Sequence, residues 1–364
     1  MPPLRVAVVG TGAFGRNHLR VYRELELAHP ELVQLVGLVD PVTERRSSFA
    51  STYNIPAFAT VTELLAVNPS LDAASICVPT SHHAAVAEQL LLAGLDVLIE
   101  KPFAATLAQA DHIMALSQAQ GRIVAVGHLE RFNPAVAATL AALHQPMFFE
   151  SHRLSVFTPR SLDVDVVLDL MIHDLDIVLS LTNSPVREVR AVGLPILSHK
   201  TDIANVRIEF ESGCVANFTA SRVSTEQVRK LRLFQPHQSL SLDFARQELL
   251  TISVDPTVVA AAIAAASAAT PATGSSPLPV PTAAAPTTPP SPSAHADHPT
   301  AGLSLTKADI PKGEPLRLEL EDFLNAVRTR TQPRVPAQAG REALALALSI
   351  NDQIAAHAHR AGLL

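Results

Sequence analysis

The chain has 364 residues, of which 48% are hydrophobic, and a formal net charge of -6. This is too much apolar material for a disordered protein and enough for two packed domains. The mild negative charge and the lack of a long basic run argue against nucleic-acid binding. The two cysteines, Cys77 and Cys214, stand far apart and form no disulfide scaffold, which favours a reducing cytoplasm.

Neither of the two main apolar runs predicts insertion into a membrane. The run at residues 4–10 is short and leads into a glycine turn, where a secretory signal would carry a cleavage site. The run at residues 84–100 is interrupted by Glu88, Gly94 and Asp96 and therefore cannot serve as an uncharged span. We expect no membrane insertion.

Valine-rich runs alternate with stretches of helical period through the first third of the sequence. Continuous apolar runs fit strands that are buried on both faces, and the helical stretches between them supply crossovers. The pattern predicts an α/β domain with a doubly wound parallel sheet over residues 1–127. Its expected strands lie at residues 4–10, 32–40, 73–79, 96–102 and 122–128.

The pattern changes near Met147 to alternating strand-like pieces with few helices between them. This predicts a second domain, residues 128–364, of the α+β class with a mostly antiparallel open sheet. Two helical stretches close the chain, and the last can return to pack on the first domain. The strand-like pieces lie at residues 148–154, 205–210, 213–220, 230–234 and 239–244, and the closing helices at 315–329 and 340–358.

Residues 256–299 are dominated by Ala, Pro, Ser and Thr. Such a composition cannot bury enough apolar surface to offset the entropy lost on ordering. We interpret this segment as a disordered insertion in the second domain, and nothing in it resembles chemistry.

A glycine turn follows the first strand directly and precedes a helical stretch. Gly10, Gly12 and Gly15 match the G-x-G-x-x-G pattern of dinucleotide sites, with a plain glycine turn as the alternative. The first glycine permits the tight turn, the second lets the backbone approach the pyrophosphate, and the third allows helix and strand to pack closely. Free amides at the helix start then face the phosphates. The predicted cofactor contacts here are Gly10, Thr11, Gly12, Ala13, Phe14 and Gly15.

Asp40 ends the second predicted strand. A carboxylate at this place can accept both hydroxyls of the adenosine ribose and repels a 2′-phosphate, which favours NAD over NADP. Arg45 and Arg46 lie close by and weaken that preference, and Arg45 is included among the predicted cofactor contacts. The alternative is that Asp40 is an ordinary turn or cap residue.

Together with the glycine turn, the motifs EKP at residues 100–102 and DLMIH at residues 169–173 give a family resemblance. Outside the insertion, nearly the whole sequence resembles the Gfo/Idh/MocA family of sugar oxidoreductases. The resemblance implies an N-terminal Rossmann domain that binds NAD, and a C-terminal α+β domain whose open sheet often mediates dimers or tetramers. We therefore expect a homo-oligomer assembled through that sheet.

The resemblance also implies contacts around the nicotinamide half of the cofactor. VPTSHH at residues 78–83 is similar to the family's P-N-x-x-H motif beside the nicotinamide ribose, with Thr80 in place of the usual Asn. GHLERFNP at residues 127–134 is similar to the segment that crosses into the second domain, with a histidine at a position more often aromatic. The contacts implied are Pro79, Thr80, His83, Glu100, Lys101 and His128.

Oxidation of a secondary alcohol with NAD needs a base for the hydroxyl proton, and Lys101 and His173 are the candidates. Lys101 follows an apolar strand and emerges at the carboxyl edge of the sheet, where partial desolvation can lower its pKa. Asp169 and His173 are four residues apart in a helical stretch and share one face, so the aspartate can bind substrate or orient the imidazole. The sequence leaves open which residue is the base. All three are also predicted substrate contacts.

Several segments look most like those of family members that oxidise UDP-N-acetylglucosamine, among them ESGCVANFTASRVS and RKLRLFQP. This implies oxidation of the 3-hydroxyl to a 3-keto nucleotide sugar for the synthesis of lipid A precursors. One alternative substrate is another sugar, an inositol or a UDP-sugar acid. The other alternative is a non-enzymatic NAD-binding sensor, against which the joint presence of Lys101, Asp169 and His173 argues.

A UDP-sugar carries a diphosphate, which needs cationic or amide donors. Arg131 and Arg153 are the predicted substrate contacts for it, with further candidates in Arg160, Arg222 and the run at residues 229–232. The HDLD sequence at residues 173–176 lacks an accompanying HExxH or CxxC pattern, so no catalytic metal is expected.

Overall fold

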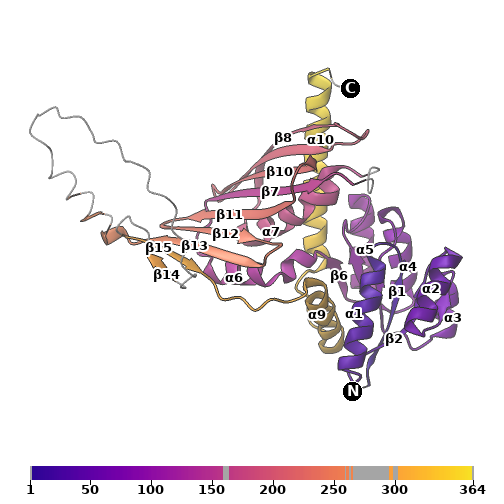
Figure 1. Cartoon of the computed structure of the whole chain (residues 1–364). Coiled ribbons are helices and arrows are strands. Elements are labelled where there is room, and N and C mark those ends of the chain that lie inside the picture. Colours follow the sequence, from indigo (N-terminus) through magenta and orange to yellow (C-terminus); the bar gives the residue numbers. More distant parts are fainter. Residues whose placement is uncertain are drawn as a thin grey trace, which may run out of the picture.

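The computed structural model describes residues 2–158, 164–258, 260–261, 264, 295–297 and 302–362. It contains two sheets, with the helices α9 (Pro315–Thr329) and α10 (Ala337–Arg360) lying between them (Figure 1). Most of the expected insertion at residues 256–299 lies outside the described residues, and so does Arg160.

The first sheet has six parallel strands in the order β3-β2-β1-β4-β5-β6. The order reverses between β1 and β4, and in open α/β sheets ligands bind beyond the carboxyl ends of the strands at such a point. The doubly wound sheet is confirmed; β3, with only two residues, is too short to show a periodic pattern in the sequence. The strands are β1 (Leu4–Val9), β2 (Val33–Val39), β3 (Ala57–Phe58), β4 (Ala73–Ile76), β5 (Asp96–Glu100) and β6 (Val124–Gly127).

The crossover helices of this domain begin and end at recognisable residues. Thr60 and Thr106 cap α3 and α5 in the same way, each hydroxyl accepting a hydrogen bond from the N–H three residues later. Glu63 and Gln109 reach back and accept from the N–H groups of Ala59 and Ala105, one residue before each cap, in an arrangement related to the capping box. The helices are α1 (Gly15–Ala28), α2 (Thr43–Tyr53), α3 (Val61–Val67), α4 (His83–Leu92) and α5 (Leu107–Gln120), with a short 3₁₀ turn η1 (Thr80–His82).

The second sheet has nine strands in the order β14-β15-β13-β12-β11-β7-β10-β9-β8. Only β7 and β10 pair in parallel, so the predicted mostly antiparallel sheet is confirmed. The sequence pattern missed β8, where a register shift after Val186 interrupts the alternation of inward and outward residues. The strands are β7 (Phe148–Val156), β8 (Val186–Leu194), β9 (Ile203–Phe210), β10 (Val215–Ser224), β11 (Val228–Gln235), β12 (Gln238–Asp243), β13 (Glu248–Val254), β14 (His295–Asp297) and β15 (Leu303–Lys307).

Helices cover one face of the second sheet and leave the other face open. Phe149, Phe210 and Phe218 are buried on the covered face, where the inward side chains meet the helices in one apolar core. The connection from the first domain is a 3₁₀ turn, η2 (Leu129–Phe132). The covering elements are α6 (Pro134–Ala142), the π-helical turn η3 (Val167–Met171), α7 (Ile172–Thr182) and part of α10.

The closing helices tie the two domains together. Leu320 and Phe323 of α9 are buried against α1 in the core of the first domain. Along α10, Leu344 packs with the first domain and Ile350 with the second. Gly340 lets α10 approach closely, because a Cβ there would lie 2.7 Å from the side chain of Val126. By packing, α9 therefore belongs to the first domain although it follows the second in sequence.

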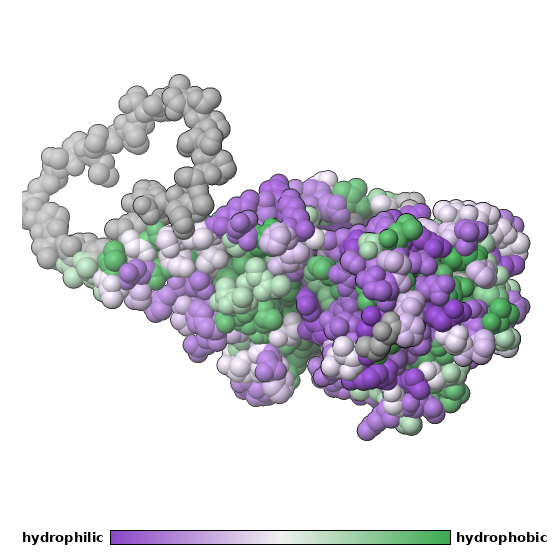
Figure 2. Space-filling view, turned by 90° about the horizontal axis from the view of Figure 1, so that it is seen from below, coloured by the Kyte–Doolittle hydropathy of each residue, from purple (hydrophilic) through white to green (hydrophobic). Residues whose placement is uncertain are grey.

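The surface differs between the domains. In the view from below, hydrophobic residues gather in a patch on the second domain, and hydrophilic residues cover much of the first (Figure 2). Among the helices in the described part of the chain, none is long and apolar enough to cross a membrane.

Candidate active site

Two glycines of the turn after β1 are required by close backbone contacts. Gly10 has φ +88°, and a Cβ on it would lie 2.8 Å from the backbone of Cys77 and Val78. A Cβ on Gly15 would lie 1.9 Å from the carbonyl oxygen of Gly10. At Gly12, in contrast, a Cβ would have nothing within 4 Å. Of these three glycines, Gly12 alone meets no described atom that would exclude a side chain, which agrees with the place of the glycine that lets a pyrophosphate approach.

A cleft of about 870 Å³ opens beside this turn, at the carboxyl ends of the parallel strands. It is large enough for a substantial part of a dinucleotide. Its walls combine the glycine turn with the ends of β2 and β4 and with α4, and include Gly10, Gly12, Ala13, Asp40, Arg45, Val78, Pro79 and His82. The predicted cofactor residues Gly10, Gly12, Ala13, Asp40, Arg45 and Pro79 thus share one cavity.

Asp40 lies in this cleft with its carboxylate already bonded. Oδ2 accepts hydrogen bonds from the N–H (2.9 Å) and hydroxyl (2.8 Å) of Thr11, and Oδ1 from the N–H of Val42 (2.9 Å). The Arg45 guanidinium lies 3.1 Å from Oδ1. Burial would raise the pKa of Asp40, but these hydrogen bonds outweigh it and lower the pKa. The carboxylate is therefore charged, and a ribose would meet Arg45 beside it.

The turn after β4 carries the predicted contacts Thr80 and His83. His83 is buried, and its ring lies between two carbonyl oxygens, 3.0 Å from that of Pro102 and 2.9 Å from that of Val78. Burial lowers the pKa of His83, so the ring is neutral and donates to one of these carbonyls. The His83 ring therefore connects the segment after β4 to the end of β5. Thr80 is the first residue of the 3₁₀ turn η1 that leads to His83.

Glu100 points into the protein. Its Oε1 lies 2.8 Å from Nε2 of the fully buried His18, and its Oε2 accepts from the N–H of Lys101 at 3.3 Å. Gly127 leaves room for this carboxylate, since a Cβ there would come within 2.8 Å of it. Phe14 packs edge-on against His18. The contacts of Glu100 therefore position the backbone of Lys101.

Lys101 reaches across to the second domain. Its Nζ donates to the carbonyl oxygen of Asp169 at 2.7 Å and lies 3.5 Å from Oδ1 of the same residue. Burial lowers the pKa of Lys101, and the charges of Asp169 and Glu100 partly oppose this shift. A lowered pKa of Lys101 agrees with the expectation from the sequence.

His173 lies near Lys101 but is not bonded to Asp169. The π-helical turn η3 holds Asp169, and its wider winding breaks the four-residue spacing that would place the aspartate over the imidazole. Among the described residues none hydrogen-bonds with the His173 ring, whose buried Nδ1 has no partner. Burial, followed by the charge of Lys101, lowers the pKa of His173 well below 6.5. The imidazole is thus neutral at physiological pH.

His128 stands against His173, with ring centroids 6.5 Å apart in an edge-to-face arrangement. It is buried, and neither ring nitrogen has a partner among the described residues. Burial lowers the pKa of His128 as well. Lys101, His128 and His173 therefore form one site at the junction of the two domains. Within the described residues, no group of three or more His, Cys, Asp or Glu side chains is arranged to hold a metal ion.

Comparisons with known proteins identify the family of the chain. Residues 4–128 match the family model described as "Oxidoreductase family, NAD-binding Rossmann fold". Residues 140–240 match the one described as "GFO/IDH/MocA C-terminal domain". The chain is 34% identical to UDP-N-acetylglucosamine 3-dehydrogenase of Acidithiobacillus ferrooxidans over 98% of its own length and 99% of that protein. It belongs to the Gfo/Idh/MocA oxidoreductase family.

Solved structures give the same result. A structure of the Acidithiobacillus ferrooxidans UDP-N-acetylglucosamine 3-dehydrogenase superposes with a TM-score of 0.80, covering 98% of this chain and 99% of that one at 34% identity. Levoglucosan dehydrogenase in complex with NADH shares the fold, with a TM-score of 0.77 at 16% identity and 97% coverage of each chain. In sequence, the chain is also similar to an inositol 2-dehydrogenase from Acidothermus cellulolyticus, with 29% identity over 52% of this chain and 56% of that protein.

This member of the family is an NAD-dependent oxidoreductase that acts on a CH–OH group. The expectation of an enzyme is confirmed, and the alternative of a non-enzymatic sensor is set aside. The cleft fits NAD on the evidence of its own residues, because Gly12 opens onto the cavity and a charged Asp40 stands beside it.

Two predicted substrate-binding arginines of this oxidoreductase have carboxylate partners. The Arg153 guanidinium is buried and bonds to Asp174 (2.7 and 2.9 Å) and to Glu130 (3.2 Å). Arg131 bonds to the buried Asp176 at 2.7 and 3.0 Å. Arg131 lies in the turn at the start of the second domain, and Arg153 lies in its sheet. The two pairs therefore join these parts to α7, which carries His173. The structure thus gives Arg131 and Arg153 a role in holding the site together.

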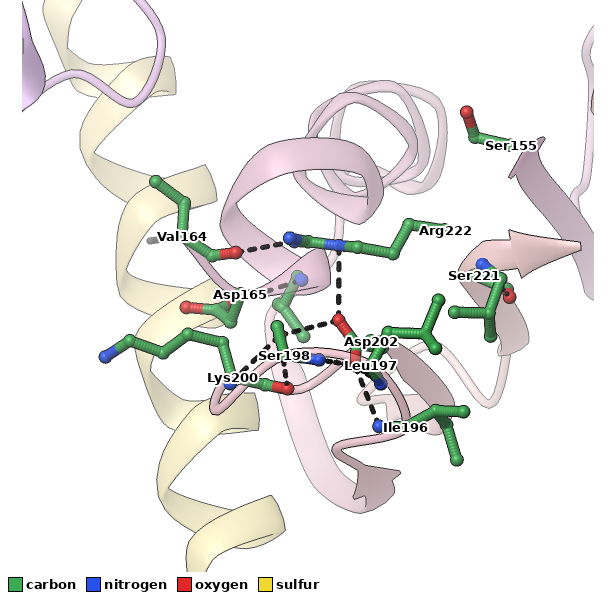
Figure 3. Close-up of polar contacts among 12 residues, drawn as sticks. Ser155, Val164, Asp165, Ile196, Leu197, Ser198, Lys200, Asp202, Ser221 and Arg222 are labelled. Carbon is green, nitrogen blue, oxygen red and sulfur yellow. Dashed lines mark hydrogen bonds and ion pairs between the residues drawn. The ribbon is translucent and has the colours of Figure 1, made fainter. Parts of the chain in front are cut away.

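Arg222 is also engaged, in a cluster around the buried Asp202 (Figure 3). Asp202 accepts from the N–H groups of residues 196–198 at 2.6–2.8 Å and from the Ser198 hydroxyl at 2.7 Å. Burial would raise its pKa, but these bonds lower it from 3.8 to about 2. Arg222 lies 3.8 Å from this carboxylate and donates to the carbonyl oxygen of Val164 at 2.5 Å.

This cluster fixes the start of the π-helical turn that carries Asp169. Besides the Arg222 contact, the N–H of Val166 donates to the carbonyl of Thr201 at 2.9 Å. Asp165 caps the turn by accepting from the N–H groups of Val167 and Leu168, and its other oxygen accepts from the side chain of Asn351 of α10 at 3.0 Å. Sequence reasoning missed Asp165 and Asp202; an aspartate two residues before a helical run is a capping signal that identifies Asp165 alone.

Gly12→Ala provides a test of the cofactor cleft. We expect the thermal midpoint of the free protein to stay unchanged, since the new Cβ meets no atom of the described residues. NADH affinity, measured by fluorescence titration, should fall about tenfold or more because the methyl group occupies the approach to the pyrophosphate. Unchanged affinity would contradict the placement of the pyrophosphate at this turn.

Arg222→Met tests the scaffold beneath the π-helical turn. Removing the guanidinium leaves the buried Asp202 without its counter-charge, so unfolding free energy should fall by about 3 kcal/mol. Arg232→Met is the matched control, because its partner Glu150 is on the surface and such pairs contribute less than about 1 kcal/mol. Urea denaturation followed by circular dichroism compares them, and equal losses would contradict a special role for Arg222.

Proposed function

We propose that this enzyme oxidises the 3-hydroxyl of UDP-N-acetylglucosamine with NAD⁺ and releases the 3-keto nucleotide sugar. The observation that carries the proposal is the similarity to a UDP-N-acetylglucosamine 3-dehydrogenase along nearly the full length of both chains. A ketone at this carbon is the substrate that a transaminase needs to make a 3-amino sugar. The product would then serve the synthesis of a lipid A precursor.

His173 takes the hydroxyl proton in this proposal. Its imidazole is neutral because its pKa lies well below 6.5, and no described residue occupies its ring nitrogens. It can therefore accept a proton without first losing one. The edge-to-face contact with His128 holds the ring in place.

Lys101 acts as the cation beside the reacting oxygen. Its Nζ is fixed by the Asp169 carbonyl, which leaves further N–H donors for the substrate. A positive charge there stabilises the alkoxide that develops as the proton leaves. When bound, NAD⁺ accepts the hydride from the carbon that bears the hydroxyl group. Asp169 binds and orients Lys101.

The second candidate is the same chemistry on a sugar or inositol without a nucleotide. It is favoured by the similarity to inositol 2-dehydrogenases, although this covers only about half of the chain. The site residues argued above serve either substrate, because each presents a secondary hydroxyl to the same base and cation.

A pH profile separates the roles of His173 and Lys101. Because the pKa of His173 is lowered, activity should persist below pH 6.5 and fall only as the imidazole gains a proton. On the alkaline side, activity should decline as the pH rises and Lys101 loses its proton. This decline should begin at a pH below 10.5, because the pKa of Lys101 is lowered too. Lys101→Met should lower kcat about 100-fold and abolish the alkaline limb. If Lys101 were the base, activity would instead rise through its pKa.

Substrate choice is measured by NADH fluorescence with purified enzyme and NAD⁺. We expect UDP-N-acetylglucosamine to produce NADH, and free N-acetylglucosamine and myo-inositol to give rates about 100-fold lower, because remote binding groups contribute to turnover. Turnover of the inositol with none of the nucleotide sugar would transfer the proposal to the second candidate.

We also propose that the enzyme forms a homo-oligomer through the open face of the second sheet. Val192 and Leu194 of β8 and the adjoining Ile196 and Leu197 are exposed by 39–58%, an apolar patch at one edge of that sheet. Light scattering should give a multiple of the chain mass, and Leu194→Asp should reduce it. A monomeric wild-type protein would contradict this assembly.

A further inference from the structure

Arg229 differs from the other arginines around the active site. Arg131, Arg153 and Arg222 each have buried carboxylate or carbonyl partners. For Arg229, the part of the chain that the structure describes offers no hydrogen bond or ion pair to the guanidinium, and the side chain is exposed. It is therefore a cation with room for a ligand.

The position of Arg229 on β11 places it on the side of the sheet where the active site lies. It stands directly opposite Arg153 of β7 in the antiparallel register. Side chains alternate along a strand, so Arg229 shares a face with the buried Leu231. Arg232 has the opposite orientation and pairs with Glu150 on the open face.

The acids near Arg229 are already neutralised. Glu130 and Asp174 both bind the guanidinium of Arg153, and Asp174 directly follows His173 in the chain. Arg229 lies close enough to His173 for its positive charge to add to the effect of burial in lowering the pKa of that imidazole. A positive charge with no partner among the described residues thus faces the site from the sheet.

We infer that Arg229 binds the diphosphate of the substrate, an inference that rests on the proposed nucleotide-sugar function and adds the residue that selects for it. A planar guanidinium with several N–H donors matches phosphate oxygens in a bidentate arrangement. Free sugars and inositols offer no such anion, so Arg229 would favour the nucleotide sugar over them by binding a group remote from the reacting carbon.

The experiment uses the full-length enzyme saturated with NADH, so that the dinucleotide cleft is filled, and measures the binding of UDP by calorimetry. Wild type is compared with Arg229→Met, Arg229→Lys and the matched control Arg232→Met. We expect Arg229→Met to weaken UDP binding about tenfold or more, Arg229→Lys to restore part of it, and Arg232→Met to leave it unchanged. Retained NADH affinity shows that each variant is folded.

Kinetics supply the second measurement. Arg229→Met should raise KM for UDP-N-acetylglucosamine about tenfold with little change in kcat, the signature of lost ground-state binding. The inference is overturned if UDP does not bind the wild-type NADH complex, or if Arg229→Met binds UDP as well as wild type. If wild type does not oxidise UDP-N-acetylglucosamine but Arg229 still governs UDP binding, the proposed substrate fails and the anion site stands.

Discussion

The hydrogen bond from the Lys101 ammonium to the carbonyl oxygen of Asp169 joins the two domains at the proposed active site. One partner ends a strand of the first sheet and the other lies in the π-helical turn of the second domain. Burial lowers the pKa of this lysine, while the neighbouring Asp169 and Glu100 partly oppose the shift. The geometry of the site therefore depends on both domains keeping their relative position.

That position is maintained by buried charges that bind other groups of the protein. Arg131 and Arg153 bind acids of α7, and Arg222 holds the backbone just before η3. Buried ion pairs of this kind add little net stability, but losing one partner is costly, so they fix geometry more than they stabilise. The helix α10 supports the same arrangement by packing against both domains, with Gly340 allowing its close approach to Val126.

Much of the first domain could be predicted because its signals are local. A strand buried on both faces is a continuous apolar run, and Gly15 is required by a contact within the turn itself, with the carbonyl oxygen of Gly10. The second domain was harder to predict. The register shift in β8 hides its alternation, and the π-helical turn changes which residues face each other, so Asp169 meets Lys101 and not His173.

The doubly wound parallel sheet, the antiparallel second sheet, the dinucleotide turn and the family of the enzyme can all be inferred from the sequence. These follow from periodicity and short motifs, which are properties of neighbouring residues. Which charges are neutralised becomes clear from the folded protein. Arg131, Arg153, Arg222 and Arg229 look alike in the sequence. The first three meet partners from distant segments, whereas Arg229 meets none within the described residues, because pairing depends on which side chains the fold brings together.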